Sequence, residues 1–254
     1  MIHRNRIAGL LLSFAVMPLA AMAQHAGHAE HEWDYTGAKG PAKWGTLKSD
    51  YSSCKLGHQQ SPIDIRGAKK EKLGEIEFDY KPSQLKLIDN GHTIQDNYAP
   101  GSGITINGVR HELLQFHFHT PSEERINGKS YPLVAHLVHK NADGKLAVVA
   151  VLFKEGKENP TLSTIWANLP KDKGVEHAIE GVNIDAGAVL PADHHYYNFA
   201  GSLTTPPCSE EVNWFVLKKP VEMSKAQLKQ FHTLYKHNAR PVQPLNGRVV
   251  KESI

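Results

Sequence analysis

The fold is decided by residues 104–153, which read ITINGVRHELLQFHFHTPSEERINGKSYPLVAHLVHKNADGKLAVVAVLF. Turn residues divide this stretch into four segments with strand-forming composition, namely Ile104–Ile106, Leu113–His119, Leu133–His139 and Leu146–Phe153. The first turn, Asn107-Gly108, suits a tight type I′ hairpin. Because short turns join successive strands, we expect these strands to be antiparallel. The nearly continuous apolar run in the last segment predicts a strand buried on both faces.

Helical signals are few outside this meander. Thr161–Leu169 follows Asn159-Pro160, which places a proline near the first turn of a short helix. Ser224–Gln227 is a capping-box pattern, and Leu228, Phe231 and Leu234 then recur at near-helical spacing. No internal repeat or low-complexity linker interrupts the chain, and its length suits one large domain. The prediction is a single, predominantly β domain with a few short surface helices.

The first 23 residues have the three-part layout of a secretory signal peptide. Basic residues come first, the apolar run Ile7–Ala20 follows, and Ala21-Met22-Ala23 is a small-x-small cleavage site. A retained membrane anchor is the alternative, but the apolar run is short for a membrane span. We therefore expect a signal peptide at 1–23, a periplasmic or secreted protein, and no membrane anchor after cleavage.

Residues 24–32, QHAGHAEHE, are polar and rich in histidine. A mobile, solvated tail is the expectation, and metal collection by its histidines is the alternative. The folded domain is then expected at 33–254.

The net charge argues against a nucleic acid partner. The formal charge is +3, and Arg4 and Arg6 are the only charged residues within 1–23, so the mature chain is near +1. A nearly neutral chain without basic runs lacks the electrostatic footprint of nucleic-acid binding. The oligomeric state is left open by the sequence.

The chain contains two cysteines, Cys54 and Cys208. In a reducing cytosol they would be two buried thiols, whereas in an exported protein a disulfide is favoured. A bridge that closes so long a loop contributes roughly 4–5 kcal/mol in the chain-entropy model.

A cluster of histidines indicates a metal site. In a strand, residues two apart share a face, so His117 and His119 lie on one face while Phe116 and Phe118 lie on the other. Centring a hairpin on Asn127-Gly128 places His136 opposite His119 and turns His139 to the other face. Because Pro121 interrupts the connection, we rely only on which side chains share a face in this register (its parity), and not on the exact pairs. Parity selects His136 as the third ligand.

Three neutral imidazoles leave one position of a tetrahedral zinc ion open, as in a catalytic site. A hydrogen-bonded pair of histidines in a wet cleft is the alternative for the H-x-H motif alone. Copper also accepts imidazoles, but nothing here supplies the Cys or Met of an electron-transfer copper site. The pattern favours Zn²⁺.

From Trp33 to Val250 the chain resembles the α-class carbonic anhydrases. The motifs that carry the resemblance are Ser61–Ile65, Asn90–His92, Gln115–His119, Ser122-Glu123, His136–His139, Gly201–Pro207 and Arg240–Leu245. It implies a central, mostly antiparallel twisted sheet with zinc at the bottom of a cleft. The implied reaction is the reversible hydration of CO₂ to bicarbonate and a proton, by attack of zinc-bound hydroxide.

The resemblance also implies roles for individual residues. Thr204 would accept a hydrogen bond from the hydroxide while donating its own proton to Glu123. Gln115 would fix the tautomer of His117. His92 would pass protons to bulk buffer, since histidine titrates near neutral pH. The residues implied around the substrate are Val138, Val148, Leu203, Thr204, Thr205, Val212 and Trp214.

The sequence departs from the family pattern at two positions. Val134 stands where the family usually has a glutamate that supports the third zinc histidine, and Glu124 replaces a usual histidine beside Glu123. Because such supporting partners typically change metal affinity or activity by about 10–100-fold, we expect weaker zinc retention than in a Val134→Glu variant.

The motifs argue against two rival functions. A catalytically weak or inactive binding protein on the same fold usually lacks a zinc histidine, whereas His117, His119 and His136 are all present here. A zinc peptidase or esterase would want the H-E-x-x-H motif, which the sequence lacks.

Overall fold

The computed structural model describes residues 32–254. The predicted signal peptide and all but the last residue of the predicted tail lie outside the described residues. The strands are β1 Asp64–Ile65, β2 Lys69–Glu71, β3 Ile76–Asp79, β4 Ser83–Asp89, β5 Ile94–Asn97, β6 Gly103–Ile106, β7 Val109–His119, β8 Arg125–Ile126, β9 Leu133–Asn141, β10 Leu146–Glu155, β11 Glu176–Ile184, β12 Tyr196–Ser202, β13 Glu210–Leu217, β14 Val221–Met223 and β15 Lys251–Ser253. The α-helices are α1 Trp44–Leu47, α2 Ser53–Leu56, α3 Pro160–Ala167 and α4 Lys225–Phe231, with 3₁₀ turns at Gly37–Lys39, Ser49–Tyr51 and Ala186–Val189.

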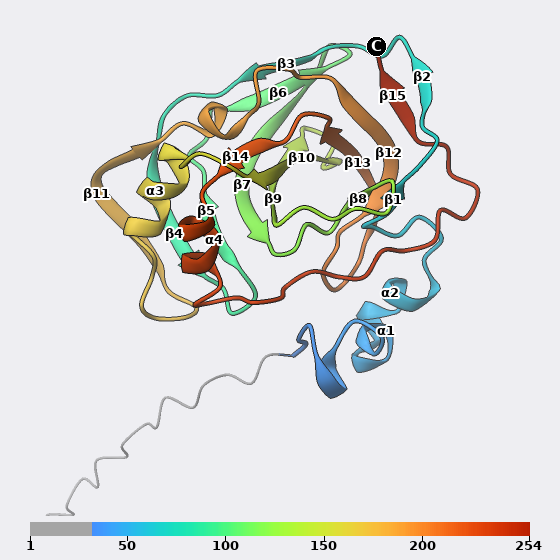
Figure 1. Ribbon diagram of the computed structural model, residues 1–254. Helices are drawn as coiled ribbons and strands as arrows, with labels where there is room; N and C mark the ends of the chain where they lie inside the picture. The colour runs from blue at the N-terminus through green and yellow to red at the C-terminus, as the bar shows by residue number, and fades with distance from the viewer. Residues whose placement is uncertain (1–31) are drawn as a thin grey trace, which may run out of the picture. The chain divides into compact units, whose positions relative to one another are not determined.

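One 13-stranded sheet dominates the domain, in the order β11-β4-β5-β7-β9-β10-β13-β12-β15-β2. Strands β3, β6 and β14 pair beside this path, and β1 and β8 form a separate two-stranded sheet. Most pairings are antiparallel, as expected, while β10 with β13 and with β14, β15 with β2, and β1 with β8 are parallel. Strands β7, β9 and β10 occupy the middle of the sheet (Figure 1).

The local signals in the sequence produce the expected turns and helices. Asn107 and Gly108 connect β6 to β7 with φ of 50° and 77°, the left-handed conformations that a type I′ turn requires. In α3, Asn159 accepts a hydrogen bond from the Leu162 N–H at 3.1 Å. The capping box of α4 is formed between Ser224 and Gln227. Helices α3 and α4 pack against each other beside the sheet (Figure 1).

The register between β7 and β9 corrects the sequence prediction. His117 faces His136 and His119 faces Val134, so the pairing is displaced by two residues from the predicted one. The turn at Asn127-Gly128 does exist, since Ile126 bridges to Lys129. A displacement by an even number of residues preserves the face of every side chain, which is why the parity argument still selected His136.

The displacement arises in a bulge before the turn. The Ser122 N–H donates to the Tyr131 carbonyl at 2.8 Å, already in the displaced register. Between this pair and the Ile126–Lys129 bridge, three residues on one side (123–125) stand against Ser130 alone on the other. Bulges redirect side chains, and here the redirected residues include two glutamates.

Two apolar clusters cover the two faces of the central strands. One contains Phe116 and Phe118 together with Leu137 of β9. The other contains Val134 and Val138 of β9. Strand β9 is therefore buried on both faces, and its alternation leaves His136 on the second face and His139 on the first.

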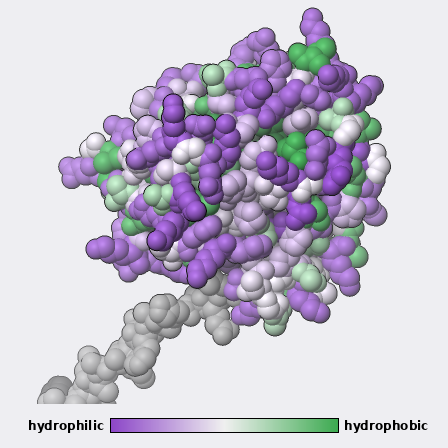
Figure 2. Space-filling view, viewed as in Figure 1, coloured by the Kyte–Doolittle hydropathy of each residue, from purple (hydrophilic) through white to green (hydrophobic). Residues whose placement is uncertain are grey.

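The surface of the domain is largely polar. The face seen in Figure 2 is mostly hydrophilic, with scattered hydrophobic residues. Within residues 32–254, no helix has the length and apolar character needed to cross a membrane.

Candidate metal centre

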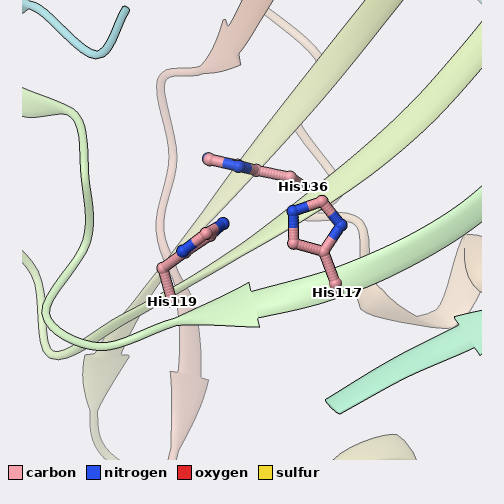
Figure 3. Close-up of side chains that lie close together, drawn as sticks. All are labelled: His117, His119 and His136. Atoms are coloured by element: carbon pink, nitrogen blue, oxygen red, sulfur yellow. The ribbon is translucent and has the colours of Figure 1, made fainter. Parts of the chain in front are cut away.

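The three histidines selected from the sequence meet at one point. His117 and His119 project from β7 and His136 projects from β9, and one ring nitrogen of each lies within 4.8 Å of the others. Figure 3 shows the three rings turned toward a common centre. The antiparallel pairing of His117 with His136 produces this convergence, because directly paired side chains on one face of a sheet are neighbours.

Two of the rings have their Nδ1–H groups committed to acceptors. His117 donates to Gln115 Oε1 at 2.8 Å, the contact expected from the sequence, and His119 donates to the backbone oxygen of Asn238 at 2.7 Å. A neutral imidazole has one donor and one acceptor nitrogen, so both rings present an Nε2 lone pair to the centre. Nε2 of His119 is buried and has no hydrogen-bond partner within residues 32–254.

The third ring is held the other way round. His136 donates from Nε2 to Glu124 Oε2 at 3.2 Å and lies 3.0 Å from Oε1, which leaves Nδ1 for the centre. Val134 is fully buried in an apolar cluster. Although Val134 cannot accept the His136 N–H, this ring does have a carboxylate partner, because Glu124 in the bulge supplies one.

The electrostatics of the rings follow from their surroundings. Burial lowers the pKa of His117 to about 3 and pushes the pKa of His119 well below its ordinary value, and the neighbouring His136 adds to both shifts. Burial also acts to lower the pKa of His136, but the charge of Glu124, its hydrogen bond and the charge of Glu123 outweigh it, so this pKa is raised.

The donor set fits a zinc ion. Three imidazole nitrogens converge, one of them a buried atom without a hydrogen-bond partner in the described part of the chain, and two carboxylates lie beside them. Imidazole nitrogen is a preferred zinc ligand, and three protein ligands leave a fourth position open.

Glu123 lies fully buried next to the rings. Its Oε1 accepts the backbone N–H of Arg240 at 2.7 Å, and its Oε2 lies 3.6 Å from His119 Nε2 and 3.8 Å from His136 Nδ1. Burial raises its pKa to about 7. The charge of Glu124 adds to this, whereas His136, the Arg240 N–H and a hydrogen bond from the Thr204 hydroxyl oppose it.

The loop that carries Thr204 is tied down by backbone hydrogen bonds and a disulfide. The Leu203 N–H donates to the Ser209 carbonyl at 2.9 Å, and the Cys208 N–H donates to the Thr205 carbonyl at 2.8 Å. Cys208 is bonded to Cys54, with their Cα atoms 5.0 Å apart, so the predicted disulfide is confirmed. A disulfide of this kind is consistent with an oxidising compartment.

The histidines lie in a cavity of about 240 Å³. It is lined by Trp33, Tyr35, Asn90, His92, Thr93, Gln95, Gln115, His117, His119, His136, Val138, Val148, Leu203, Thr204, Thr205 and Trp214. The cavity has a polar side and an apolar side, which follow the order of the strands in the sheet. Strand β5 and the turn before it contribute polar groups, while β9, β10 and β13 contribute Val138, Val148 and Trp214. Of the residues expected around the substrate, Val212 is not among the residues that line the cavity; it is buried in the same apolar cluster as Val138, Val148 and Trp214.

His92 lies on the polar side, in the turn between β4 and β5. Its backbone N–H donates to Asn90 Oδ1 at 3.0 Å, and its ring stacks on Trp33 with centroids 3.6 Å apart and planes 8° apart. The stacking partner precedes His92 by 59 residues, so no local pattern could reveal it.

The contacts that three further residues make with the site were not predicted from the sequence. Asn238 and Arg240 contact His119 and Glu123 through backbone groups, which are the same for every residue type, so these two contacts leave no trace in the sequence. Glu124 had an indirect signal, because a valine at 134 cannot accept the His136 N–H and some other acceptor was required.

Comparison with known proteins agrees with this geometry. Residues 39–254 match the family model described as eukaryotic-type carbonic anhydrase. The carbonic anhydrase of Nostoc sp. is 46% identical over 227 residues, covering 87% of this chain and 86% of that protein. That of Klebsiella pneumoniae is 45% identical over 245 residues, covering 95% and 96%.

A solved structure is also similar throughout the described domain. The α-carbonic anhydrase from Thermovibrio ammonificans, in complex with the inhibitor sulfanilamide, superposes with a TM-score of 0.84 at 44% identity and covers 86% of this chain and 98% of that chain. With the family model matched over most of its length and relatives well above 40% identity, this chain belongs to the α-class, or eukaryotic-type, carbonic anhydrase family.

Proposed function

We propose that this protein catalyses the reversible hydration of CO₂ to bicarbonate and a proton in the cavity around His117, His119 and His136. The observation that carries the proposal is the arrangement of these rings. Each has one nitrogen committed to an acceptor and the other turned to a shared centre. When bound there, Zn²⁺ would lower the pKa of a coordinated water molecule and so supply a nucleophile near neutral pH.

Thr204 and Glu123 orient that nucleophile. A hydroxyl has a single proton, and we infer that Thr204 commits it to Glu123, because interaction with this hydroxyl lowers the pKa of the carboxyl. The threonine oxygen could then only accept a hydrogen bond from the cavity, so Thr204 would orient a hydrogen-bond donor held beside the histidines. Glu123 is itself held by the Arg240 N–H, so the orienting pair is rigid.

The apolar wall receives CO₂. The substrate is small and apolar, and Val138, Val148, Leu203 and Trp214 line the cavity beside the histidines. Thr205 lines the same cavity. Val212 packs in the same apolar cluster as the wall residues and supports their position.

His92 exports the proton. It lines the same cavity on the polar side, stacked on Trp33, and histidine is the side chain whose charge changes near neutral pH. A side chain in this position can receive a proton from cavity water and release it to buffer.

We also place the mature protein in the periplasm or the surrounding medium. The signal-peptide pattern at 1–23 and the disulfide between Cys54 and Cys208 support this assignment.

The test uses the mature chain from residue 24, purified after export. We expect one zinc per chain by atomic absorption, rapid CO₂ hydration by stopped flow, and inhibition by sulfanilamide, the ligand in the Thermovibrio structure. His119→Ala is expected to lose both zinc and activity. Stoichiometric zinc without CO₂ hydration would overturn the proposal in favour of a binding protein.

A further inference from the structure

The two positions at which the sequence departs from the family pattern, 124 and 134, both lie beside His136. Val134 lies two residues before His136 on β9, and Glu124 lies in the bulge between β7 and the turn at Asn127-Gly128. Both side chains are fully buried, and only one of them is polar.

Glu124 reaches the outer nitrogen of His136. Oε2 accepts the Nε2–H at 3.2 Å, and Oε1 is 3.0 Å from the same nitrogen. Burying a carboxylate costs several kcal/mol unless the charge is paired and hydrogen-bonded. His136 is the side chain to which Glu124 is hydrogen-bonded within residues 32–254, so the cost of burial is offset at this one contact.

Position 134 faces the same ring from along the strand. Residues two apart in a strand share a face, so the side chain at 134 points to the same side of the sheet as His136. The valine packs into the apolar cluster with Val138, Val148 and Leu152. A longer acidic side chain at 134 would therefore compete with Glu124 for one nitrogen.

The bulge brings Glu124 to the ring. Ser122 and Tyr131 exchange hydrogen bonds, with the Ser122 N–H donating to the Tyr131 carbonyl and the Tyr131 N–H donating to Ser122 Oγ, both at 2.8 Å. Ser122 Oγ also donates to the carbonyl of Glu124 at 2.7 Å. These contacts fix the backbone on which the carboxylate stands.

We propose that Glu124 is the positioning residue for His136. From the bulge, it accepts the hydrogen bond of His136 that a carboxylate at position 134 would accept from the strand. It holds the ring as the Nε2–H tautomer, so that His136 offers Nδ1 while His117 and His119 offer Nε2. This inference rests on the proposed zinc site.

The first consequence is a tautomer pattern that nuclear magnetic resonance can read. In long-range ¹H–¹⁵N spectra recorded at alkaline pH, where all three rings are neutral, His136 is expected as the Nε2–H form and His117 and His119 as the Nδ1–H form, in both the zinc-free and the zinc-loaded protein. In Glu124→Ala, which removes the acceptor at Nε2 and leaves Glu123 Oε2 3.8 Å from Nδ1, zinc-free His136 should lose its preference for the Nε2–H form. A His136 ring that stays in the Nε2–H form in this variant would overturn the proposal.

The second consequence is the rate at which zinc leaves. Loss of a supporting partner changes metal affinity by about 10–100-fold, so Glu124→Gln, which keeps shape but not charge, is expected to release zinc to an excess of chelator roughly tenfold faster. Glu155→Gln removes an exposed carboxylate at the end of β10 and should release zinc at the wild-type rate.

The third consequence is a rescue. Adding Val134→Glu to Glu124→Gln should return the release rate to within about threefold of wild type, since a supporting carboxylate then approaches from the strand. Val134→Glu alone should give no slower release than wild type, because a second buried carboxylate would repel Glu124.

The outcomes separate this inference from the function on which it rests. A wild-type protein that binds no stoichiometric zinc would defeat the proposed function. Wild-type protein with zinc, combined with Glu124→Gln release within twofold of wild type or with no rescue in the double variant, would overturn only the role of Glu124. Thermal unfolding of each variant confirms that the compared proteins are folded.

Discussion

Asp96 is a buried carboxylate that the site does not use, and we predict that it makes the protein less stable as the pH rises. It lies on β5 between Leu87 of β4 and Phe116 of β7, and it is 1% exposed. Its Oδ1 accepts the backbone N–H of Lys86 at 2.8 Å, while its Oδ2 is buried without a hydrogen-bond partner among residues 32–254.

The charged form of this carboxyl is disfavoured in the fold. Burial is the main cause, and the charge of Glu176 on β11 adds to it, while the N–H and the charge of Lys86 oppose it. The pKa of Asp96 rises from 3.8 to about 7.

The sign and size of the effect follow from linkage. The folded state binds the proton of Asp96 more tightly than the unfolded state, so the contribution of this group to stability is fully present below pH 3.8 and is lost as the pH rises through about 7. About three pKa units at ~1.4 kcal/mol each give a loss of about 4 kcal/mol above that window. Between pH 5 and pH 8 the expected loss is about 3 kcal/mol.

Asp96→Asn removes the titration and keeps an oxygen for the Lys86 N–H. We therefore expect the variant to gain about 3 kcal/mol on the wild type between pH 5 and pH 8. The assay is urea unfolding followed by tryptophan fluorescence at saturating zinc, because zinc linkage is then shared by both proteins and cancels in the difference.

Asp172→Asn is the matched control, since Asp172 is an exposed aspartate. Its stability relative to wild type should stay constant with pH. If the difference between Asp96→Asn and wild type changes by less than about 1 kcal/mol over this range, burial of Asp96 does not control its ionisation and the reasoning is refuted.

Three further outcomes are expected. Reducing the Cys54–Cys208 bridge, which spans 154 residues, should lower the free energy of unfolding by about 5 kcal/mol in the chain-entropy model; two reactive thiols in the unreduced, denatured protein would show that no bridge forms. His136→Ala should lose zinc by atomic absorption, whereas His139→Ala should keep it, because His139 is on the opposite face, hydrogen-bonded to a tyrosine hydroxyl at 2.8 Å. Loss of zinc from His139→Ala and retention in His136→Ala would show that His139, and not His136, is the ligand. His92→Ala should slow CO₂ hydration in dilute buffer and recover with added imidazole; a maximal rate that does not depend on buffer concentration would exclude proton export by His92.

The sequence alone determined those features that depend on local geometry. Alternation along a strand places His117 and His119 on one face and Phe116 and Phe118 on the other, whatever the strand pairs with. The positive φ of Asn107 and Gly108 follows from residue types that tolerate this conformation. Parity also selected His136, because any even displacement of register keeps a side chain on its face.

The tertiary structure alone decided what each of these residues meets. The two-residue displacement between β7 and β9 depends on the bulge at 123–125, and that bulge carries Glu124 to His136. The carbonyl that holds His119 comes from Asn238, 119 positions away. Contacts of this kind form only when segments far apart in the sequence come together in the fold. Their energies depend on where the two groups lie in space and not on the residue types next to them in the sequence, so no local pattern in the chain predicts them.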